Sequence, residues 1–462
     1  MATDLKESHN HRVTLAILGD QASRKRRLPT VWQNRDFRLL WAGQSVSMLG
    51  TAVTSVAVPL LAVVTLHASL AQMGVLGTLI RLPFLLYPIA GVWVDRTRRR
   101  QILISTDLAR GVLLLSVPVA ALSGVLTLPF LFVVAFTVML LGVWFDTAYL
   151  SYVPALVERH ELTTANSVMG TSNSAAQIAG GSLGGFLVQL LTAPIAIVVD
   201  SLSYVVSGIA VLRIRKPEPP LSVRQGSGLR DVMSSTTTGM RFVVHNRVLA
   251  PLALAIGIFC LAGAAESALY VFYLAKVLHL GAGIIGLTLA AAGPGAVAGA
   301  ALAGKVQRRL GIGTTIIGAL TLFAAAAWLI PLAPADQAVA VPMLMAAAFL
   351  MGVGLQLCNT NVITTRQMIA PPELIGRVTA SFRFMAFGTG PFGALLGGLL
   401  GTTLGARGGL YAAVAGLLLA PAVVLASPVR RLRRLPVPEH AEEDGMRQDP
   451  PAQEQPKEAH SG

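Results

Sequence analysis

The amino-acid sequence predicts an all-α membrane protein, with 12 transmembrane helices arranged as two parallel six-helix repeats. Three observations support this fold class. Hydrophobic residues make up 54% of the 462 residues, charged residues only 13%, and the mean hydropathy is +0.66, whereas a soluble domain carries about 25% charged residues. Apolar stretches long enough to cross a bilayer recur along the chain. A basic turn and several glycines repeat at one constant offset along the sequence.

Twelve apolar stretches divide the chain into two bundles, because a spanning helix needs about 20 mostly apolar residues. We expect spans at 38–66, 70–94, 101–123, 128–151, 167–191 and 194–212 in a first bundle (37–212), and at 248–277, 283–305, 312–333, 338–361, 378–404 and 408–427 in a second bundle (248–427). A linker at 213–247, which contains a short amphipathic helix, joins the bundles. Polar tails at 1–36 and 428–462 flank them, and the second tail is expected to be disordered.

The internal repeat is visible in one turn and in four pairs of glycines. Gly91 opens a charged turn between two apolar stretches, and Gly304 opens the corresponding basic turn in the second bundle. The interval from Gly91 to Gly304 defines the repeat offset, and positions separated by it are called equivalent positions. The glycine pairs at equivalent positions are Gly50 and Gly263, Gly180 and Gly393, Gly184 and Gly397, and Gly185 and Gly398. A chain that repeats half of itself within a bilayer is most often a transporter.

Lysine and arginine are concentrated on one side of the predicted bundles. Of the 36 such residues, 31 fall in the tails, the linker and the turns of that side, whereas Lys276 and Arg407 lie in turns of the opposite side. Positively charged loops remain in the cytoplasm. Both termini and the linker are therefore expected to be cytoplasmic, in a multi-pass protein of the inner (plasma) membrane. We interpret the basic run at 24–27 as a contact with anionic lipid of the bilayer rather than with nucleic acid.

The sequence has no residue grouping that indicates an enzyme or a metal site. Cys260 and Cys358 lie in apolar stretches, so we expect buried thiols without a disulfide. The histidines are scattered, and Ser/His/Asp groupings, nucleotide-binding loops and metal-ligand spacings are missing. We therefore expect no catalytic residue, no cofactor and no metal, and a monomer whose ligands are a small-molecule substrate and protons.

The turn at 91–101 resembles the signature loop of the major facilitator superfamily, a pattern of Gly, Asp, Arg, a second Gly and two basic residues. Five positions match the pattern: Gly91, Asp95, Arg96, Arg99 and Arg100. Arg98 replaces the usual second glycine, which implies a less tight turn that keeps its charges.

This resemblance implies that the loop is a cytoplasmic latch of the outward-facing state. Asp95 would approach the positive N-terminus of the helix that begins near Gly376, and Arg99 would pair with Asp146 at the end of the fourth span. The alternative is that these charges only fix the topology.

Further segments resemble one branch of the superfamily, that of the enterobactin exporter and the macrolide-efflux drug:proton antiporters. These segments lie at 34–44, 107–110, 153–157, 162–166, 200–204 and 373–378. The resemblance covers roughly 34–427. It implies alternating access between two bundles, proton coupling and a part in multidrug resistance.

Glycine motifs in the fifth and eleventh spans resemble the antiporter motif of this superfamily, in which a Gly-Pro pair precedes a Gly-Gly pair. The fifth span contains Gly180, Gly181, Gly184 and Gly185, and the eleventh contains Gly390, Pro391, Gly393 and Gly397. Gly181 stands where proline is usual. Small residues four apart allow helices to approach closely, so generic tight packing and a hinge or proton-leak barrier are both open.

Ionisable residues within the spans are the remaining candidates, because each costs about 2.5 kcal/mol or more at mid-depth on insertion scales. Asp107 and Arg110 are three residues apart on one helix face, so we expect an intramembrane ion pair, which Arg81 could join.

Glu266 lies deep in the seventh span without a basic residue within one turn. We expect it to take up and release a proton or to neutralise a cationic substrate, and the alternative is a static pair with Arg383. Asp200, in the sixth span, is the second coupling candidate.

The sequence therefore favours a proton-coupled exporter of amphipathic organic compounds such as macrolide-like drugs, siderophores or secondary metabolites. The alternatives are a proton-coupled uptake permease of the same fold and a membrane scaffold or sensor that does not transport.

Overall fold

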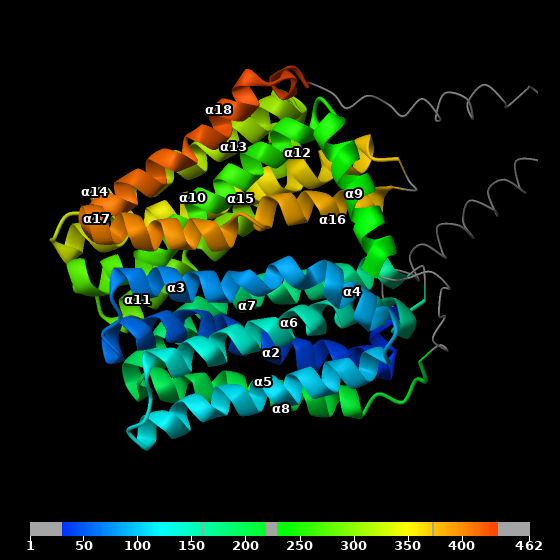
Figure 1. The fold of residues 1–462 in the computed structure, drawn as a ribbon, viewed down its shortest axis with the longest axis horizontal. Helices are drawn as coiled ribbons and strands as arrows, with labels where there is room; N and C mark the ends of the chain where they lie inside the picture. The colour runs from blue at the N-terminus through cyan, green and yellow to red at the C-terminus, as the bar shows by residue number, and fades with distance from the viewer. Residues whose placement is uncertain (1–29, 159–160, 219–228, 372–373, 433–462) are drawn as a thin grey trace, which may run out of the picture.

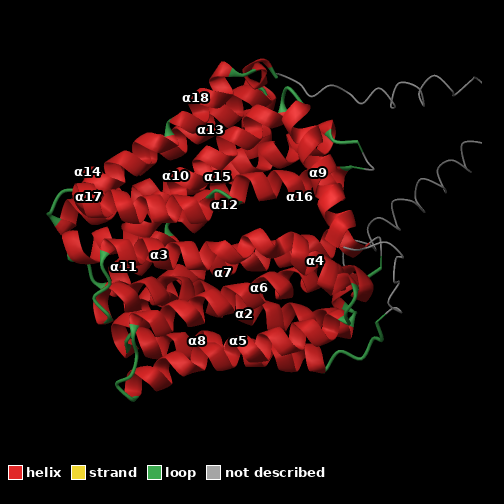
Figure 2. Cartoon of the chain, in the orientation of Figure 1, coloured by secondary structure: helices red, strands yellow, loops and turns green. Residues whose placement is uncertain are grey.

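The computed structural model describes residues 30–158, 161–218, 229–371 and 374–432, and these ranges consist of helices, turns and loops without a strand (Figures 1 and 2). The helices form an N-terminal half and a C-terminal half, drawn one above the other in Figure 1. Most of the two predicted tails lies outside the described residues.

The N-terminal half contains six predicted spans, two of which change helix type along their length. Its elements are η1 (Thr30–Trp32), α2 (Arg35–Leu60) with the π-helical turn η2 (Leu61–Thr65), α3 (Leu70–Arg81), the 3-10 turn η3 (Leu82–Leu86), α4 (Tyr87–Asp95), α5 (Arg99–Leu122), α6 (Leu128–Leu156), α7 (Leu162–Leu191) and α8 (Ala193–Leu212).

The C-terminal half follows the linker helix α9 (Leu229–His245). Its elements are α10 (Leu249–Phe272) with the π-helical turn η5 (Tyr273–Val277), α11 (Ala282–Ala290), α12 (Ala292–Leu310), α13 (Ile312–Ala327), α14 (Leu329–Leu332), α15 (Gln337–Ile369), α16 (Ile375–Phe387), α17 (Gly390–Leu417), α18 (Leu419–Ala426) and η6 (Pro428–Arg431).

Eleven helical segments of the described chain are long and apolar enough to cross a membrane. The last of them, Ile375–Ala426, has 52 residues, whereas about 20 residues suffice for one crossing. Gly405 interrupts this segment with φ 74° and ψ 168°, a conformation that ends a helix. The interruption divides the segment into two spans, so the 12 predicted spans are all present.

Several helices extend beyond the predicted spans at one end of the molecule. This end, which we call the basic end, holds the start of α2, the turn at 96–98 and the turn at Gly311. There α6 continues to Leu156, α7 already begins at Leu162, and α15 continues to Ile369. The predicted spans are shorter because hydropathy detects only the part of a helix that lies in hydrocarbon.

The internal repeat is visible in the turns at the other end, which we call the opposite end. The π-helical turns η2 and η5 are followed by His67 and His279, which have φ 53° and φ 52°. Their backbone hydrogen bonds also correspond, because Ala68 N donates to Ala62 O at 2.8 Å and Leu280 N donates to Leu274 O at 2.9 Å. Two segments that are far apart in the sequence therefore form the same turn.

Each half has its own apolar core, and the halves also share one. Leu103 and Phe145 belong to the N-terminal core, and Leu252 belongs to the C-terminal core. A further cluster combines Leu60 of α2 with Tyr273 and other C-terminal residues near the opposite end. The two halves are thus packed together at the opposite end.

Glycines bring the halves into backbone contact at two places. A Cβ atom added to Gly74 of α3 would lie 2.7 Å from the Cα of Gly398 of α17, and one added to Gly286 of α11 would lie 2.6 Å from the Cα of Gly185 of α7. Figure 1 shows α3 beside α17 toward the opposite end, and α9 crossing between the halves at the basic end. Both glycine contacts require that no side chain separates the backbones.

Candidate functional site

Two spans have an irregular helical turn where they pack against each other between the halves, and we call them the broken spans. The second span changes from α3 to a 3-10 turn after Arg81, where Pro83 stands at the start of the turn. In the eleventh span, α16 ends at Phe387 and α17 begins with Gly390 and Pro391, and Gly388 and Thr389 link them with right-handed helical backbone angles. Proline lacks a backbone N–H and cannot continue a helix without a break. Discontinuous helices within membrane spans expose backbone groups and commonly mark the substrate or ion site of transporters.

Arg81 connects the two broken spans to α10 of the C-terminal half. Its guanidinium donates to Gly77 O and to Ser267 Oγ, both at 3.1 Å. A Cβ atom at Gly390 would lie 3.3 Å from the Cδ of Arg81, so the arginine packs directly on the start of α17. Thr78 Oγ1 donates to Pro391 O at 3.0 Å. Residues of α3 are therefore bonded to both α10 and α17 across the interface between the halves.

Glu266 stands beside this contact. It is only 7% exposed, it precedes Ser267 on α10, and Arg81 is the charged group that acts on it electrostatically. The two pairings considered from the sequence are therefore replaced: Arg81 lies by Glu266 and not by the Asp107–Arg110 pair, and Arg383 is not the cation that faces Glu266. The spacing of residues along one helix could not indicate this neighbour, because it lies in the other half.

Arg383 and Asp146 lie elsewhere on the walls between the halves, and both are exposed. The hydroxyl of Tyr87 donates to Asp146 Oδ2 at 3.0 Å, and Arg383 acts electrostatically on Tyr87. Tyr87 of the N-terminal half thus stands between a carboxylate of its own half and a guanidinium of the other half. The predicted pair of Asp146 with Arg99 is not formed, because Asp146 is bonded to Tyr87 instead.

The predicted ion pair of Asp107 and Arg110 lies in the interior of the N-terminal half. Arg110 Nη2 donates to Asp107 Oδ1, and its guanidinium lies 4.5 Å from the ring centre of Phe145 and 4.2 Å from that of Tyr204. Asp107 is fully buried and Arg110 is 7% exposed. The two aromatic faces and the carboxylate offset the cost of burying this guanidinium.

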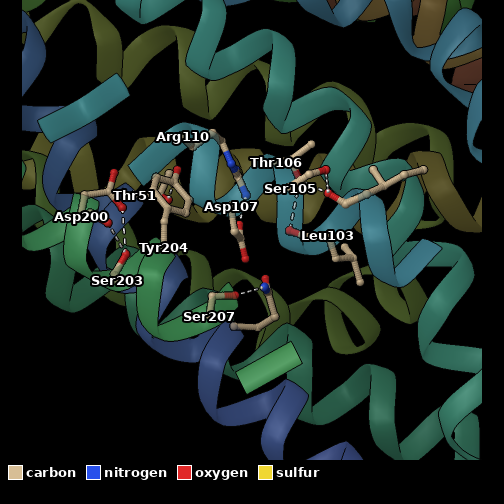
Figure 3. Close-up of polar contacts among 12 residues, drawn as sticks. Thr51, Leu103, Ser105, Thr106, Asp107, Arg110, Asp200, Ser203, Tyr204 and Ser207 are labelled. Atoms are coloured by element: carbon tan, nitrogen blue, oxygen red, sulfur yellow. Dashed lines mark hydrogen bonds and ion pairs between the residues drawn. The ribbon is translucent and has the colours of Figure 1, made fainter. Parts of the chain in front are cut away.

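Asp200 belongs to the same interior cluster (Figure 3). Ser203 Oγ donates to Asp200 Oδ1 at 3.0 Å, and the hydroxyls of Thr51 and Tyr204 are hydrogen-bonded at 3.0 Å. In Figure 3, Tyr204 lies between Asp200 on one side and Arg110 on the other. Asp200 and Glu266, the two coupling candidates, therefore occupy different environments.

The signature loop is held by a residue that the sequence analysis missed. The carboxylate of Glu218, from the start of the linker, accepts hydrogen bonds from the backbone N–H groups of Arg99 and Arg100. It supplies the N-cap that α5 otherwise lacks, since Arg98 gives no side-chain cap. Arg100 Nη2 donates to Leu212 O at 2.7 Å at the end of α8, where a positive charge complements the helix dipole.

Two other loop residues lie in more open surroundings. A Cβ atom at Gly91 would meet nothing within 4 Å, and Arg96 is exposed. The side chain of Asp95 lies outside what the structure describes, so its predicted approach to the helix near Gly376 remains a prediction.

Each glycine motif uses two faces. Gly180 and Gly184 lie against α2 of their own half, just as Gly393 and Gly397 lie against α10 of theirs. Gly181 faces Ala290 of the other half, where an added Cβ atom would lie 3.1 Å from its Cα. The motifs therefore pack a bundle internally on one face and form the interface between the halves on the other.

Ser267 and Thr78 are further site residues that the sequence analysis missed. Neither has a charge or belongs to a motif, so no local signal identified them. The breaks did leave a signal, because Pro83, Pro88 and the Gly390–Pro391 pair interrupt apolar stretches, which is the sequence pattern of a discontinuous span.

Comparisons with known proteins agree with this architecture. The uncharacterized MFS-type transporter YvqJ of Bacillus subtilis (strain 168) is 24% identical over 362 residues, which cover 74% of this chain and 83% of that protein. Macrolide efflux protein A of Streptococcus pyogenes is 27% identical over 192 residues, which cover 39% of this chain and 45% of that protein.

Solved structures with the same fold include a bacterial homologue of the iron transporter ferroportin in an inward-facing state. It is 19% identical, with a TM-score of 0.66 over 85% of this chain and 98% of that chain. A bacterial ferroportin homologue in an outward-facing state has a TM-score of 0.53 at 18% identity, with the same coverage. A family model described as Major Facilitator Superfamily matches residues 40–391. The chain is a multi-pass membrane protein and belongs to the Major Facilitator Superfamily.

Proposed function

We propose that the protein is a proton-coupled exporter of amphipathic organic compounds, such as macrolide-like drugs, siderophores or secondary metabolites. The observation that carries this proposal is the meeting of two broken spans at Arg81, Ser267 and Glu266. A carboxyl group, a guanidinium and interrupted helices lie together at the interface that must rearrange during transport. The similarity to macrolide efflux protein A supports export and the substrate class.

In the proposed orientation, the basic end faces the cytoplasm of a cell whose inner (plasma) membrane holds the protein, and both termini are cytoplasmic. The distribution of lysine and arginine supports this orientation. The glycine contacts then close the outer side, which corresponds to an inward-facing state. The higher TM-score with the inward-facing than with the outward-facing ferroportin homologue supports the same state.

The proposed coupling uses the charge of Glu266. An ionised Glu266 attracts Arg81 and strengthens the bond of α3 to α10, which favours the state with a closed outer side. Substrate bound beside Arg81 weakens that attraction and lets the outer contacts open. On the outer side the substrate leaves and a proton from outside binds Glu266. The protein then returns to the inward-facing state, where the proton leaves to the cytoplasm and Glu266 is ionised again. A shift of a few kcal/mol is sufficient to change which of two states predominates.

The signature loop has the matching proposed task at the cytoplasmic side. When the halves close there, Asp95, Arg96 and Arg99 would contact the start of α16 and stabilise the outward-facing state. Glu218 keeps the loop in position in both states because it belongs to the same half.

The test is substrate flux in inside-out membrane vesicles with an imposed proton gradient, with radiolabelled erythromycin as the probe. A gradient that is acidic inside should drive erythromycin into the vesicles. Glu266→Gln should reduce this gradient-driven accumulation by at least about 10-fold, because the carboxyl group no longer titrates. Asp336→Asn is the matched control, since Asp336 caps α15 at the opposite end and asparagine can also cap.

The direction of flux separates the alternatives. A proton-coupled uptake permease would move the probe out of such vesicles rather than into them. A scaffold or sensor would give no flux of any substrate, with or without a gradient. Equal accumulation by the wild type and Glu266→Gln would contradict the proposed role of Glu266.

A further inference from the structure

The interior of the N-terminal half holds more buried carboxyl groups than buried cations. Asp107 is 0% exposed and Asp200 is 1% exposed. Arg110 forms an ion pair with Asp107 and also acts electrostatically on Asp200. One guanidinium therefore faces two buried carboxyl groups, and a buried charge without compensation is costly.

Oxygen atoms converge on Asp200. Ser203 Oγ lies 3.0 Å from Asp200 Oδ1, and Thr51 Oγ1 also acts on this carboxylate. Thr54 Oγ1 faces it as well, but forms no hydrogen bond of normal geometry. Asp200 Oδ2 is likewise buried and without a hydrogen-bond partner among the described residues. Buried polar atoms in native proteins are normally satisfied, so Asp200 Oδ2 and Thr54 Oγ1 are two buried oxygens for which a partner is expected.

The close approach of α2 and α8 shapes this group of oxygens. A Cβ atom added to Gly50 would lie 2.6 Å from Asp200 Oδ1, so only glycine lets the carboxylate reach α2. The C-terminal half shows that packing does not need these polar groups. The equivalent positions of Asp200, Ser203 and Thr51 are Ala413, Gly416 and Ala264, and Ala413 is buried there.

We propose that the carboxylate of Asp200, with the hydroxyl oxygens of Ser203, Thr51 and Thr54, binds one Na⁺ ion. Oxygen-only ligands suit a hard cation. One positive charge balances the excess negative charge of the cluster. A divalent ion would be neutralised only in part, because the site has a single carboxylate. A proton needs only one acceptor oxygen, so the several oxygens that surround Asp200 favour a metal ion over a proton. The site is separate from Glu266, so it stands whether or not the proposed export is correct.

The test is thermal unfolding of the purified full-length protein in detergent at constant ionic strength, with choline chloride replaced stepwise by NaCl or KCl. A ligand that binds only the folded state raises its stability. Saturating Na⁺ should raise the midpoint of the wild type by about 2–5 °C over choline, and K⁺ should have less effect. Asp200→Asn should lose the Na⁺-dependent rise, and Asp336→Asn should keep it.

Ser203→Ala and Thr54→Val serve as second variants, because both keep a buried side chain of similar size if Asp200→Asn fails to fold. Each should raise the half-saturating Na⁺ concentration by roughly 10-fold. Equal midpoints in NaCl, KCl and choline chloride would overturn the proposal. A rise that follows acidification but not Na⁺ would also overturn it, since the carboxyl group would then bind a proton.

Discussion

The two halves have the same helical architecture, but at one pair of equivalent positions the N-terminal half has a charged residue and the C-terminal half has an apolar one. In the N-terminal half, Arg110 of α5 lies against the ring of Tyr204 of α8. The equivalent positions in the C-terminal half are Phe323 and Leu417, and these two residues share a hydrophobic cluster there. The same helix contact is therefore made once with a buried charge and once with apolar side chains. The charge is not needed to build the bundle, which favours a functional reason for it.

A second comparison concerns the turns between the last two spans of each half. Thr192 has φ 86° and ψ 155°, and Gly405, at the equivalent position, has φ 74° and ψ 168°. Only glycine adopts this conformation without strain. The N-terminal half thus carries a strained threonine in a turn where the C-terminal half has the residue that the geometry favours.

The largest expected effect comes from removing the charge of Arg110 alone. Arg110→Phe introduces the residue of the C-terminal half but leaves Asp107 buried without its partner, which should cost about 3–5 kcal/mol of stability. The double variant Asp107→Leu/Arg110→Phe copies the pattern of Leu320 and Phe323 and should recover most of that loss. Thermal unfolding in detergent measures both. A double variant as unstable as the single variant would show that the halves are not equivalent here.

The next effect concerns the glycine contacts between the halves. Gly185→Val and Gly398→Val place a side chain where an added Cβ atom would lie within 3 Å of the facing backbone. Each should destabilise the closed outer contact by about 1–3 kcal/mol and reduce the export rate. Gly318→Val is the control, because a Cβ atom at Gly318 of α13 meets nothing within 4 Å. Equal transport rates in all three variants would argue against closure at these glycines.

Exchanging the turn residues tests the strain at Thr192. Thr192→Gly should change stability little or raise it, because the relieved strain of about 1 kcal/mol is partly offset by the added freedom of glycine in the unfolded chain. Gly405→Thr should lower stability by about 1–2 kcal/mol. Unfolding midpoints that move the same way in both variants would contradict the assigned conformations.

The smallest expected effect is that of Glu218 at the signature loop. Glu218→Ala removes the acceptor for two backbone N–H groups at the start of α5 and should cost about 1 kcal/mol. Glu218→Gln keeps an acceptor and should retain most of the stability. Hydrogen exchange of the Arg99 and Arg100 amides reports the loss directly, and unchanged exchange in Glu218→Ala would show that the cap is unimportant.

The fold could be predicted from the sequence because its determinants are local. Apolar length identified the spans, and the constant offset between the glycine pairs identified the repeat. The turns at His67 and His279, one residue short of that offset, have the same backbone conformation. The ion pair of Asp107 and Arg110 could also be predicted, since a spacing of three residues places both on one helix face.

Partners across the halves could not be predicted in this way. Arg81 lies by Ser267 and Glu266, which are far from it in the sequence, and only the packing of α3 on α10 determines that choice. The same holds for Glu218 and Arg99, which come together through the fold of the linker start. Sequence patterns identify the residues that are costly to bury. Which group compensates that cost depends on the tertiary structure.

The central claim is that the two halves alternate about the contact of Arg81 with α10. It is tested most directly by distances between spin labels in a cysteine-free background, measured for Thr97→Cys with Ala380→Cys at the basic end and for Ala71→Cys with Thr402→Cys at the opposite end. On acidification with erythromycin, we expect the first distance to shorten and the second to lengthen, and we expect Glu266→Gln to lose this response to acid. Distances that stay constant, or that change in the same direction at both ends, would contradict the account.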